Sequence, residues 1–283
     1  MAWKFSDGGG ENNAAIKGLS QIGGASTGGS VGIYSSSTTQ HHPLGYKVEF
    51  DDGRLFRYAH FVSAVPVGKL AALDASVAIQ TSFDSAFVDS AGTGSDYAVG
   101  AKTVYVKSSD ITSDDAADVF ADGYLHITDD TGEGYTYRIK SNDAGAAETA
   151  NVMRIDLYDG LNAAIVSEGS CSITGNRYRN LAVYNAATDD MVSGNSVATQ
   201  AAGDYGFVQT RGVSTILADE SAGTIAAGTI AQASDAVDGA AQPFGGGATN
   251  SEDDHSYSTE PIIGTFLTAA VTAEYVAIDL NIE

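Results

Sequence analysis

Apolar and polar side chains alternate along much of the chain from residue 46 onward. Tyr46, Val48 and Phe50 fall on one side of an extended segment, an Asp-Asp-Gly turn follows, and residues 55–60 alternate again. A period of two is typical of β-strands, and Asp-Gly between two alternating runs is a strong hairpin signal. This pattern predicts a β-hairpin over 46–60.

The middle of the chain, residues 98–183, continues the pattern in shorter pieces that Gly-containing polar turns separate. Several short strands at regular spacing are typical of a small sandwich or barrel. Residues 73–97, rich in Ala, Ser and Asp, are interpreted as the connection into this unit. No long helix is expected anywhere. The predicted strands of the unit are 102–107, 123–128, 135–140, 152–158 and 172–174.

The last third of the chain supplies a further set of strands, which ends in a clean alternation from Tyr275 to Ile282. Residues 233–258 contain a Gly-Gly-Gly run and many polar residues, which predicts a long exposed loop. The predicted strands of this last third are 203–210, 213–217, 228–231 and those within 262–282. A further strand is predicted over 65–70, close to the first hairpin.

Two segments echo each other. Residues 56–76 and 207–234 both run from an aromatic strand through a Val-rich link into Gly-Lys-Leu-Ala or Gly-Thr-Ile-Ala. The echo groups residues 46–97 and 184–283 into one discontinuous β domain, into which the β-sandwich or β-barrel of residues 98–183 is inserted. The sequence therefore predicts an all-β fold.

Residues 1–45 differ from the rest because Gly, Ser, Thr and Asn dominate them. Such a segment has too little apolar surface to order itself. It nevertheless carries Trp3, Phe5 and Ile16 at wide intervals, which favours an extended N-terminal arm that becomes ordered along a neighbour. A plain flexible leader is the alternative interpretation.

Charge narrows the range of partners. The 283 residues hold 14 Lys and Arg against 36 Asp and Glu, a formal net charge of −22, and such a surface repels nucleic acid. Solubility explains the dispersed carboxylates, and a high-salt habitat is the alternative. No apolar run is long enough for a membrane span, and the N-terminal residues lack the apolar region of a signal peptide. The single cysteine, Cys171, is expected to be a small buried residue.

The titratable residues form no recognised catalytic or metal-binding motif. The five histidines have no metal-ligand spacing, and no nucleophile elbow, phosphate-cradling loop or dinucleotide fingerprint occurs. Residues 129–133 hold three carboxylates in one turn, which we interpret as a solvated hairpin turn in preference to a calcium loop. We therefore expect no enzyme activity, cofactor or metal. A glycosidase, which needs only two well-placed carboxylates, stays an alternative.

The order of several strand and turn motifs resembles that of tailed-phage head decoration (cement) proteins. The resemblance implies a small β-barrel or sandwich of the β-tulip type, and a homotrimer on the outer capsid surface of the virion that binds the major capsid protein and bridges capsomers. The motifs are DGRLFRYAH (52–60), VGKL (67–70), VFADGYLHITDDTGEGYTYRIKSN (119–142), YGFVQTRGVSTILA (205–218), AAGTIAQAS (226–234) and IIGTFLTAAVTAEYVAIDLNI (262–282).

Basic residues are scarce in this chain, which makes exposed arginines plausible contacts for an acidic partner. Pairing with nearby Asp residues is the alternative for them. A carbohydrate- or receptor-binding module, exposed through the 233–258 loop, is the second functional hypothesis, and a tailspike-like glycosidase is the third. The predicted interaction residues are Trp3, Phe5 and Ile16 in the arm, with Arg54, Arg57 and Arg211 in the β domain.

Overall fold

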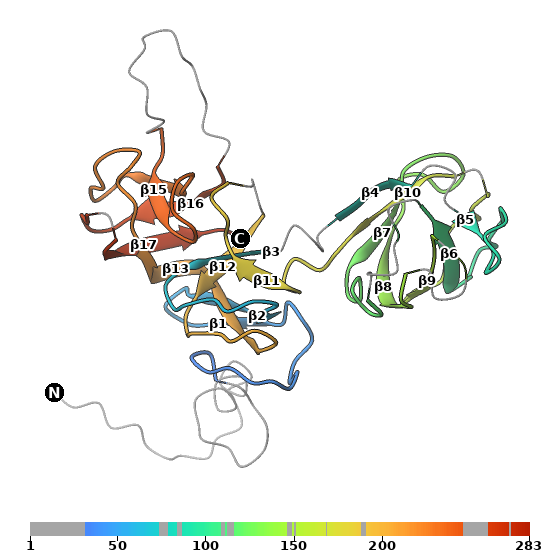
Figure 1. The fold of residues 1–283 in the computed structure, drawn as a ribbon, viewed down its shortest axis with the longest axis horizontal. Helices are drawn as coiled ribbons and strands as arrows, with labels where there is room; N and C mark the ends of the chain where they lie inside the picture. The colour runs from blue at the N-terminus through green and yellow to red at the C-terminus, as the bar shows by residue number, and fades with distance from the viewer. Residues whose placement is uncertain are drawn as a thin grey trace, which may run out of the picture.

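The computed structural model shows an all-β protein, which confirms the predicted fold class. Its named strands form two antiparallel sheets in separate lobes (Figure 1), and no helix occurs among the described residues. The described residues are 32–73, 79–83, 87–108, 111, 116–145, 149, 151–167, 169–187, 191–245, 260–271 and 273–283, with only the backbone given for 79–83.

The first sheet has ten strands in the order β11-β3-β12-β13-β17-β16-β14-β15, with β2 also paired to β13 and β1 to β2. Strands from both ends of the chain meet in it. Its strands are β1 (Lys47–Glu49), β2 (Leu55–His60), β3 (Leu70–Leu73), β11 (Leu181–Val183), β12 (Val192–Ser196), β13 (Tyr205–Leu217), β14 (Ile230–Ala233), β15 (Ala241–Pro243), β16 (Ile262–Phe266) and β17 (Tyr275–Asn281).

The predicted hairpin is present as β1 and β2. Glu49 lies opposite Leu55, and the Phe50 amide donates to the Arg54 carbonyl at 2.9 Å across the turn. Gly53 has a φ of 85°, a conformation that glycine adopts without steric cost, so the Asp-Gly pair fits this turn.

Strand β13 is the longest element because two predicted strands, 203–210 and 213–217, join into one. Its first half pairs with β2 and its second half with β17, and the register shifts between Gln209 and Arg211. Gly212, with a φ of 83°, lies at this irregularity. The buried Gln209 amide donates to the carbonyls of Arg211, Gly212 and Val213 at 3.0–3.1 Å, so its side chain bonds back onto the irregular segment.

Strand β2 carries buried side chains on both faces. Phe56 and Tyr58 pack against Ile33 and Leu44, while Ala59 belongs to a separate cluster on the other face. The segment that holds Ile33 and Leu44 therefore packs onto the first sheet, although the arm was predicted to extend over 1–45. Full burial of one such large side chain contributes about 1.5–3 kcal/mol.

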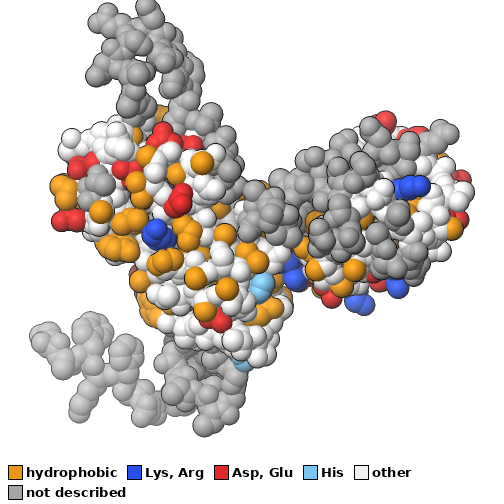
Figure 2. Space-filling view, viewed as in Figure 1, with side chains coloured by type: hydrophobic (Ala, Val, Ile, Leu, Met, Phe, Trp, Pro, Cys, Tyr) orange, Lys and Arg blue, Asp and Glu red, His pale blue; other side chains and the backbone are white. Residues whose placement is uncertain are grey.

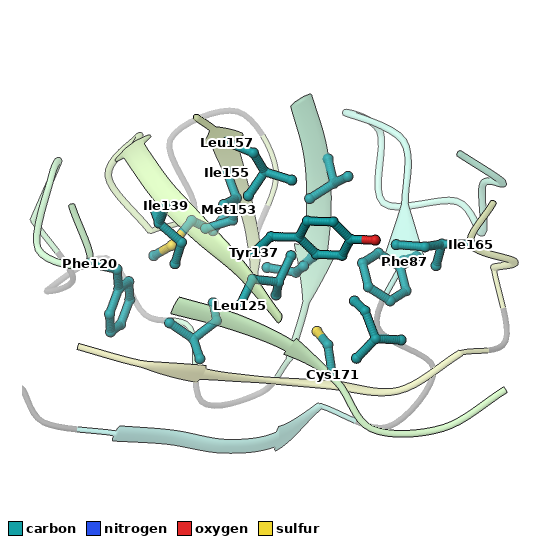
Figure 3. Packing of buried hydrophobic residues seen from close by; sticks show 14 of the residues in the cluster. Phe87, Phe120, Leu125, Tyr137, Ile139, Met153, Ile155, Leu157, Ile165 and Cys171 are labelled. Atoms are coloured by element: carbon teal, nitrogen blue, oxygen red, sulfur yellow. The ribbon is translucent and has the colours of Figure 1, made fainter. Parts of the chain in front are cut away.

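The second sheet has seven strands in the order β4-β10-β7-β8-β9-β6-β5. It curls around one apolar cluster, because Phe87 near one end of the order and Cys171 near the other belong to the same core (Figure 3). Its strands are β4 (Ile79–Phe83), β5 (Phe87–Val88), β6 (Thr103–Lys107), β7 (Tyr124–Ile127), β8 (Thr136–Asn142), β9 (Val152–Leu157) and β10 (Cys171–Thr174).

Five strands of the second sheet match those predicted, but its limits differ from 98–183. Strands β4 and β5 lie in the stretch that was interpreted as a connection, and β11 pairs in the first sheet with β3. Within the predicted loop 233–258, β15 is a buried strand, and residues 246–259 lie outside the described residues. The predicted strand over 65–70 begins only at Leu70.

Candidate interaction surface

A row of side chains crosses four neighbouring strands of the first sheet on its solvent side. Val213 of β13 lies opposite Asp279 of β17, Asp279 opposite Thr265 of β16, and Thr265 opposite Ile230 of β14. Directly opposed residues of antiparallel strands share a face. Val213 and Ile230 are 58% and 46% exposed, whereas Ile278, next to Asp279 in sequence, is buried in the core. The row therefore points to solvent.

Further exposed apolar side chains adjoin this row. Ile262 of β16 is 55% exposed, and the ring of Tyr275 in β17 lies against Gly68 while its hydroxyl donates to the Val67 carbonyl at 3.4 Å. Figure 2 shows hydrophobic side chains gathered on this lobe around a basic group. We name this set the apolar face, and it consists of Val67, Val213, Ile230, Ile262 and Tyr275.

A hollow of ≈ 670 Å³ opens on the apolar face among Val213, Ile230 and Ile262. Gly264 cannot carry a side chain there, because an added Cβ would lie 2.1 Å from the Asp279 carbonyl oxygen. Glycine thus permits the close approach of β16 to β17. The glycines that line the hollow are Gly53, Gly212 and Gly264.

Arg211 and Asp279 give the hollow its charge. The Arg211 guanidinium donates to Glu49 at 2.5 Å and to the Gly53 carbonyl at 3.3 Å. The pKa of Glu49 is lowered by Lys47, at 2.8 Å, and further by Arg211. Asp279 also lines the hollow, and its carboxylate makes no hydrogen bond or ion pair within the described part of the chain.

A second hollow of ≈ 280 Å³ adjoins the first, and Val213 lines both. Arg54 lies at this second hollow, where its guanidinium donates to the Tyr34 hydroxyl at 2.9 Å and to Asp52 at 2.7 Å. It also lies 5.2 Å from the centroid of the Phe50 ring. The hydrogen bond to Asp52 raises the pKa of Arg54, and the backbone amide and side chain of Arg54 lower that of Asp52.

Arg57 lies apart from these hollows. Its guanidinium pairs with the Glu283 carboxylate, donates to the Gly45 carbonyl at 2.9 Å and lies 5.9 Å from the centroid of the Tyr178 ring. The structure thus brings Arg54 and Arg211 to the apolar face and places Arg57 elsewhere. All three arginines have acidic partners in their own chain, and Arg54 pairs with a nearby Asp as the alternative interpretation expects.

The remaining predicted interaction residues, Trp3, Phe5 and Ile16, lie outside the described residues. The apolar face itself was not predicted from the sequence. One signal was available, because Ile262 and Ile263 are consecutive apolar residues in a strand, where side chains normally alternate between the two faces. Ile263 is buried in the core, so Ile262 is left on the solvent side.

Two titratable residues elsewhere lie in structural surroundings. His126 lies between the hydroxyls of Thr136 and Thr174 at 3.1 Å each, and Cys171 is buried, which raises the pKa of its thiol. Among the described residues, no group of His, Cys, Asp or Glu side chains is arranged to hold a metal ion. The described part of the chain also contains no helix with the length and apolarity to cross a membrane.

The comparisons with known proteins add no relative. No family model, curated protein or solved structure matches the chain.

Proposed function

We propose that this chain is a non-enzymatic virion structural protein, a decoration protein that binds the outer surface of an assembled icosahedral head. The observation that carries the proposal is the apolar face, where Val213, Ile230 and Ile262 surround an open hollow. Contiguous exposed apolar surface with a polar rim is characteristic of protein–protein contact sites. The order of strand motifs directs the proposal to capsid decoration.

The apolar face has the components of an interface centre. β-Branched side chains held on a rigid sheet lose little conformational entropy when a partner covers them. Arg54 and Arg211, at the edge of the face, are already paired with Asp52 and Glu49, so a partner that covers them buries neutralised charges. We infer that the face receives an apolar or aromatic side chain from the shell protein.

Decoration stabilises a head by mass action. A protein that binds only the assembled lattice lowers the free energy of that state relative to free capsomers. A homotrimer offers three such faces and so bridges neighbouring capsomers, with interfaces that typically bury ~1,600 Å² each. The net charge of −22 suits a position outside the shell, away from packaged DNA.

The test is co-sedimentation of the purified protein with empty heads assembled from the accompanying major capsid protein. Wild-type protein is expected to sediment with the heads and to raise the temperature at which they fall apart. Ile262→Asp is expected to weaken binding by ~30-fold or more, the effect of losing a hot-spot contact. Val99→Asp, on the second lobe, is the matched control because Val99 is 64% exposed.

Two outcomes would overturn the proposal. In the first, wild-type protein does not sediment with the heads; in the second, the Ile262→Asp variant binds the heads as well as the Val99→Asp control does. Glycan binding by the isolated protein, without any gain in head stability, would instead support a carbohydrate-binding module. Copy number in purified particles gives an independent check, because decoration requires hundreds of copies and a tail or portal component only a handful.

A further inference from the structure

We propose that, in the free protein, residues 1–31 of the chain fold back onto the apolar face and place Trp3 and Phe5 in its hollow. This inference concerns the free subunit and does not rest on the proposed function. The hollow is then filled by a segment of the same chain. That segment covers the apolar surface until a partner displaces it.

The place where residues 1–31 join the described chain supports this occupant. Ile33 is anchored in the core of the first lobe, and the next residue, Tyr34, lines the hollow that adjoins the larger one. The Arg54 side chain lies between the smaller and the larger hollow. Its guanidinium donates a hydrogen bond to the Tyr34 hydroxyl, and its side chain lies 3.1 Å from the position that a Cβ would take at Gly212, which lines the larger hollow. The segment therefore starts beside the surface that it is proposed to cover.

Length and tethering favour the same chain. Thirty-one residues span up to about 100 Å when extended, far more than the width of one lobe requires. A segment tethered at residue 32 is present near the hollow at an effective concentration of about millimolar, which a separate molecule rarely reaches. A modest contact is then enough to keep the segment in place.

The chemistry of the two partners is complementary. In an extended segment Trp3 and Phe5 project to the same side, ~7 Å apart, so both rings enter one hollow together. Lys4, between them, projects to the opposite side of such a segment, so the two aromatic rings carry the contact with the hollow. Aromatic side chains bury a large area at low entropic cost, which suits the open, glycine-lined floor.

Trp3 reports on this contact directly because it is the only tryptophan of the chain. In full-length wild-type protein we expect blue-shifted Trp emission and protection from iodide quenching, both independent of protein concentration. Ile262→Asp is expected to shift the emission to that of water-exposed Trp and to raise the quenching constant at least threefold. Val99→Asp, equally polar but on the second lobe, is expected to leave both unchanged.

A second pair of substitutions, which perturb the fold less, controls for misfolding. Val213→Thr and Ile262→Thr keep the β-branched shape of exposed positions, and together they are expected to raise iodide quenching of Trp3 while circular dichroism stays that of wild type. The proposal would be overturned if iodide quenched Trp3 of the wild-type protein as strongly as free tryptophan. It would also be overturned if these substitutions left the Trp3 emission unchanged. Protection that vanishes on dilution would overturn the assignment to the same chain and transfer the segment to a second copy. Head binding is a separate measurement, so its failure leaves this result intact.

Discussion

Asp219, just after β13, provides the sharpest test of how the first sheet is held together. The side chain is 1% exposed, and its carboxylate accepts hydrogen bonds from the hydroxyls of Ser221 and Ser234 at 2.6 Å and from the Ser221 amide at 2.9 Å. The Ser234 hydroxyl oxygen in turn accepts from the amides of Ala236 and Val237. One carboxylate therefore links the end of β13 to the turn between β14 and β15.

The substitution Asp219→Ala removes these three bonds and leaves the fully buried Ser234 hydroxyl without its acceptor. A hydrogen bond to a charged group contributes ~1.5–3 kcal/mol, and an unsatisfied buried donor costs ~1–3 kcal/mol. The two terms share the Ser234 proton, so we expect the free energy of unfolding to fall by about 3 kcal/mol. Asp219→Asn keeps one acceptor oxygen and should lose less, and Ser221→Ala should lose about 1 kcal/mol.

The effect depends on pH in a defined direction. Burial alone would raise the pKa of Asp219, but the hydrogen bonds from Ser221 and Ser234 outweigh it and hold the pKa below its usual value. A carboxyl with a lowered folded pKa contributes stability above its unfolded pKa, ~3.9, and this contribution is lost as the pH falls through the folded pKa. The difference between wild type and Asp219→Ala should therefore be constant from neutral pH to about pH 5 and shrink below about pH 4.

Urea denaturation followed by circular dichroism measures the loss, and hydrogen exchange over residues 205–245 assigns it to the first sheet. The assignment is needed because the two sheets need not unfold in one transition. A loss below about 0.5 kcal/mol, the range of neutral surface changes, would refute the network argument. So would a loss no larger than that of Ser221→Ala.

Three further outcomes are expected. Gly264→Ala should destabilise the first sheet by about 1–3 kcal/mol, because its Cβ would clash with the Asp279 carbonyl; unchanged thermal denaturation would contradict this. The Cys171 thiol, whose pKa burial raises, should react with iodoacetamide only as urea unfolds the second sheet, and prompt labelling of native protein would show that it is accessible. Arg57→Ala should cost about 1 kcal/mol by removing the ion pair with Glu283, a loss that high salt reduces; an equal loss at all salt concentrations would assign it to packing.

Local patterns predicted the parts of the fold that local chemistry controls. The β1–β2 hairpin follows from alternation and one Asp-Gly turn, and both act within a few residues. The same holds for β17, whose alternation places Ile278 and Leu280 in the core.

Strand β12 was missed because its sequence, Val-Ser-Gly-Asn-Ser, has the composition of a loop. Two of its buried polar side chains bond to carbonyl groups that are distant in the sequence. The Ser193 hydroxyl donates to the Arg177 carbonyl at 2.6 Å, and the Asn195 amide donates to the Thr215 carbonyl at 2.9 Å. Such pairing depends on tertiary structure and leaves no local period in the sequence.

The apolar face escaped prediction for a related reason. Whether Val213 or Ile230 is exposed depends on which strands cover each side of the sheet, and the sequence does not specify those neighbours. The arginines were predicted as contacts because basic residues are few in this chain. Arg54 and Arg211 lie at the edge of the apolar face, however, and the centre of the face is aliphatic. The segment that holds Trp3 and Phe5 lies outside the described residues, so its predicted role stays a prediction.

Because β3 pairs with β11, the second sheet can be exchanged as one unit. Leu73 and Leu181 are direct partners, so the chain leaves the first sheet and returns to it at adjacent positions. A foreign domain whose ends lie close together should therefore fit in place of residues 79–174 while β3 and β11 still close the first sheet. Such a chimaera would present any chosen cargo at one fixed point of the scaffold.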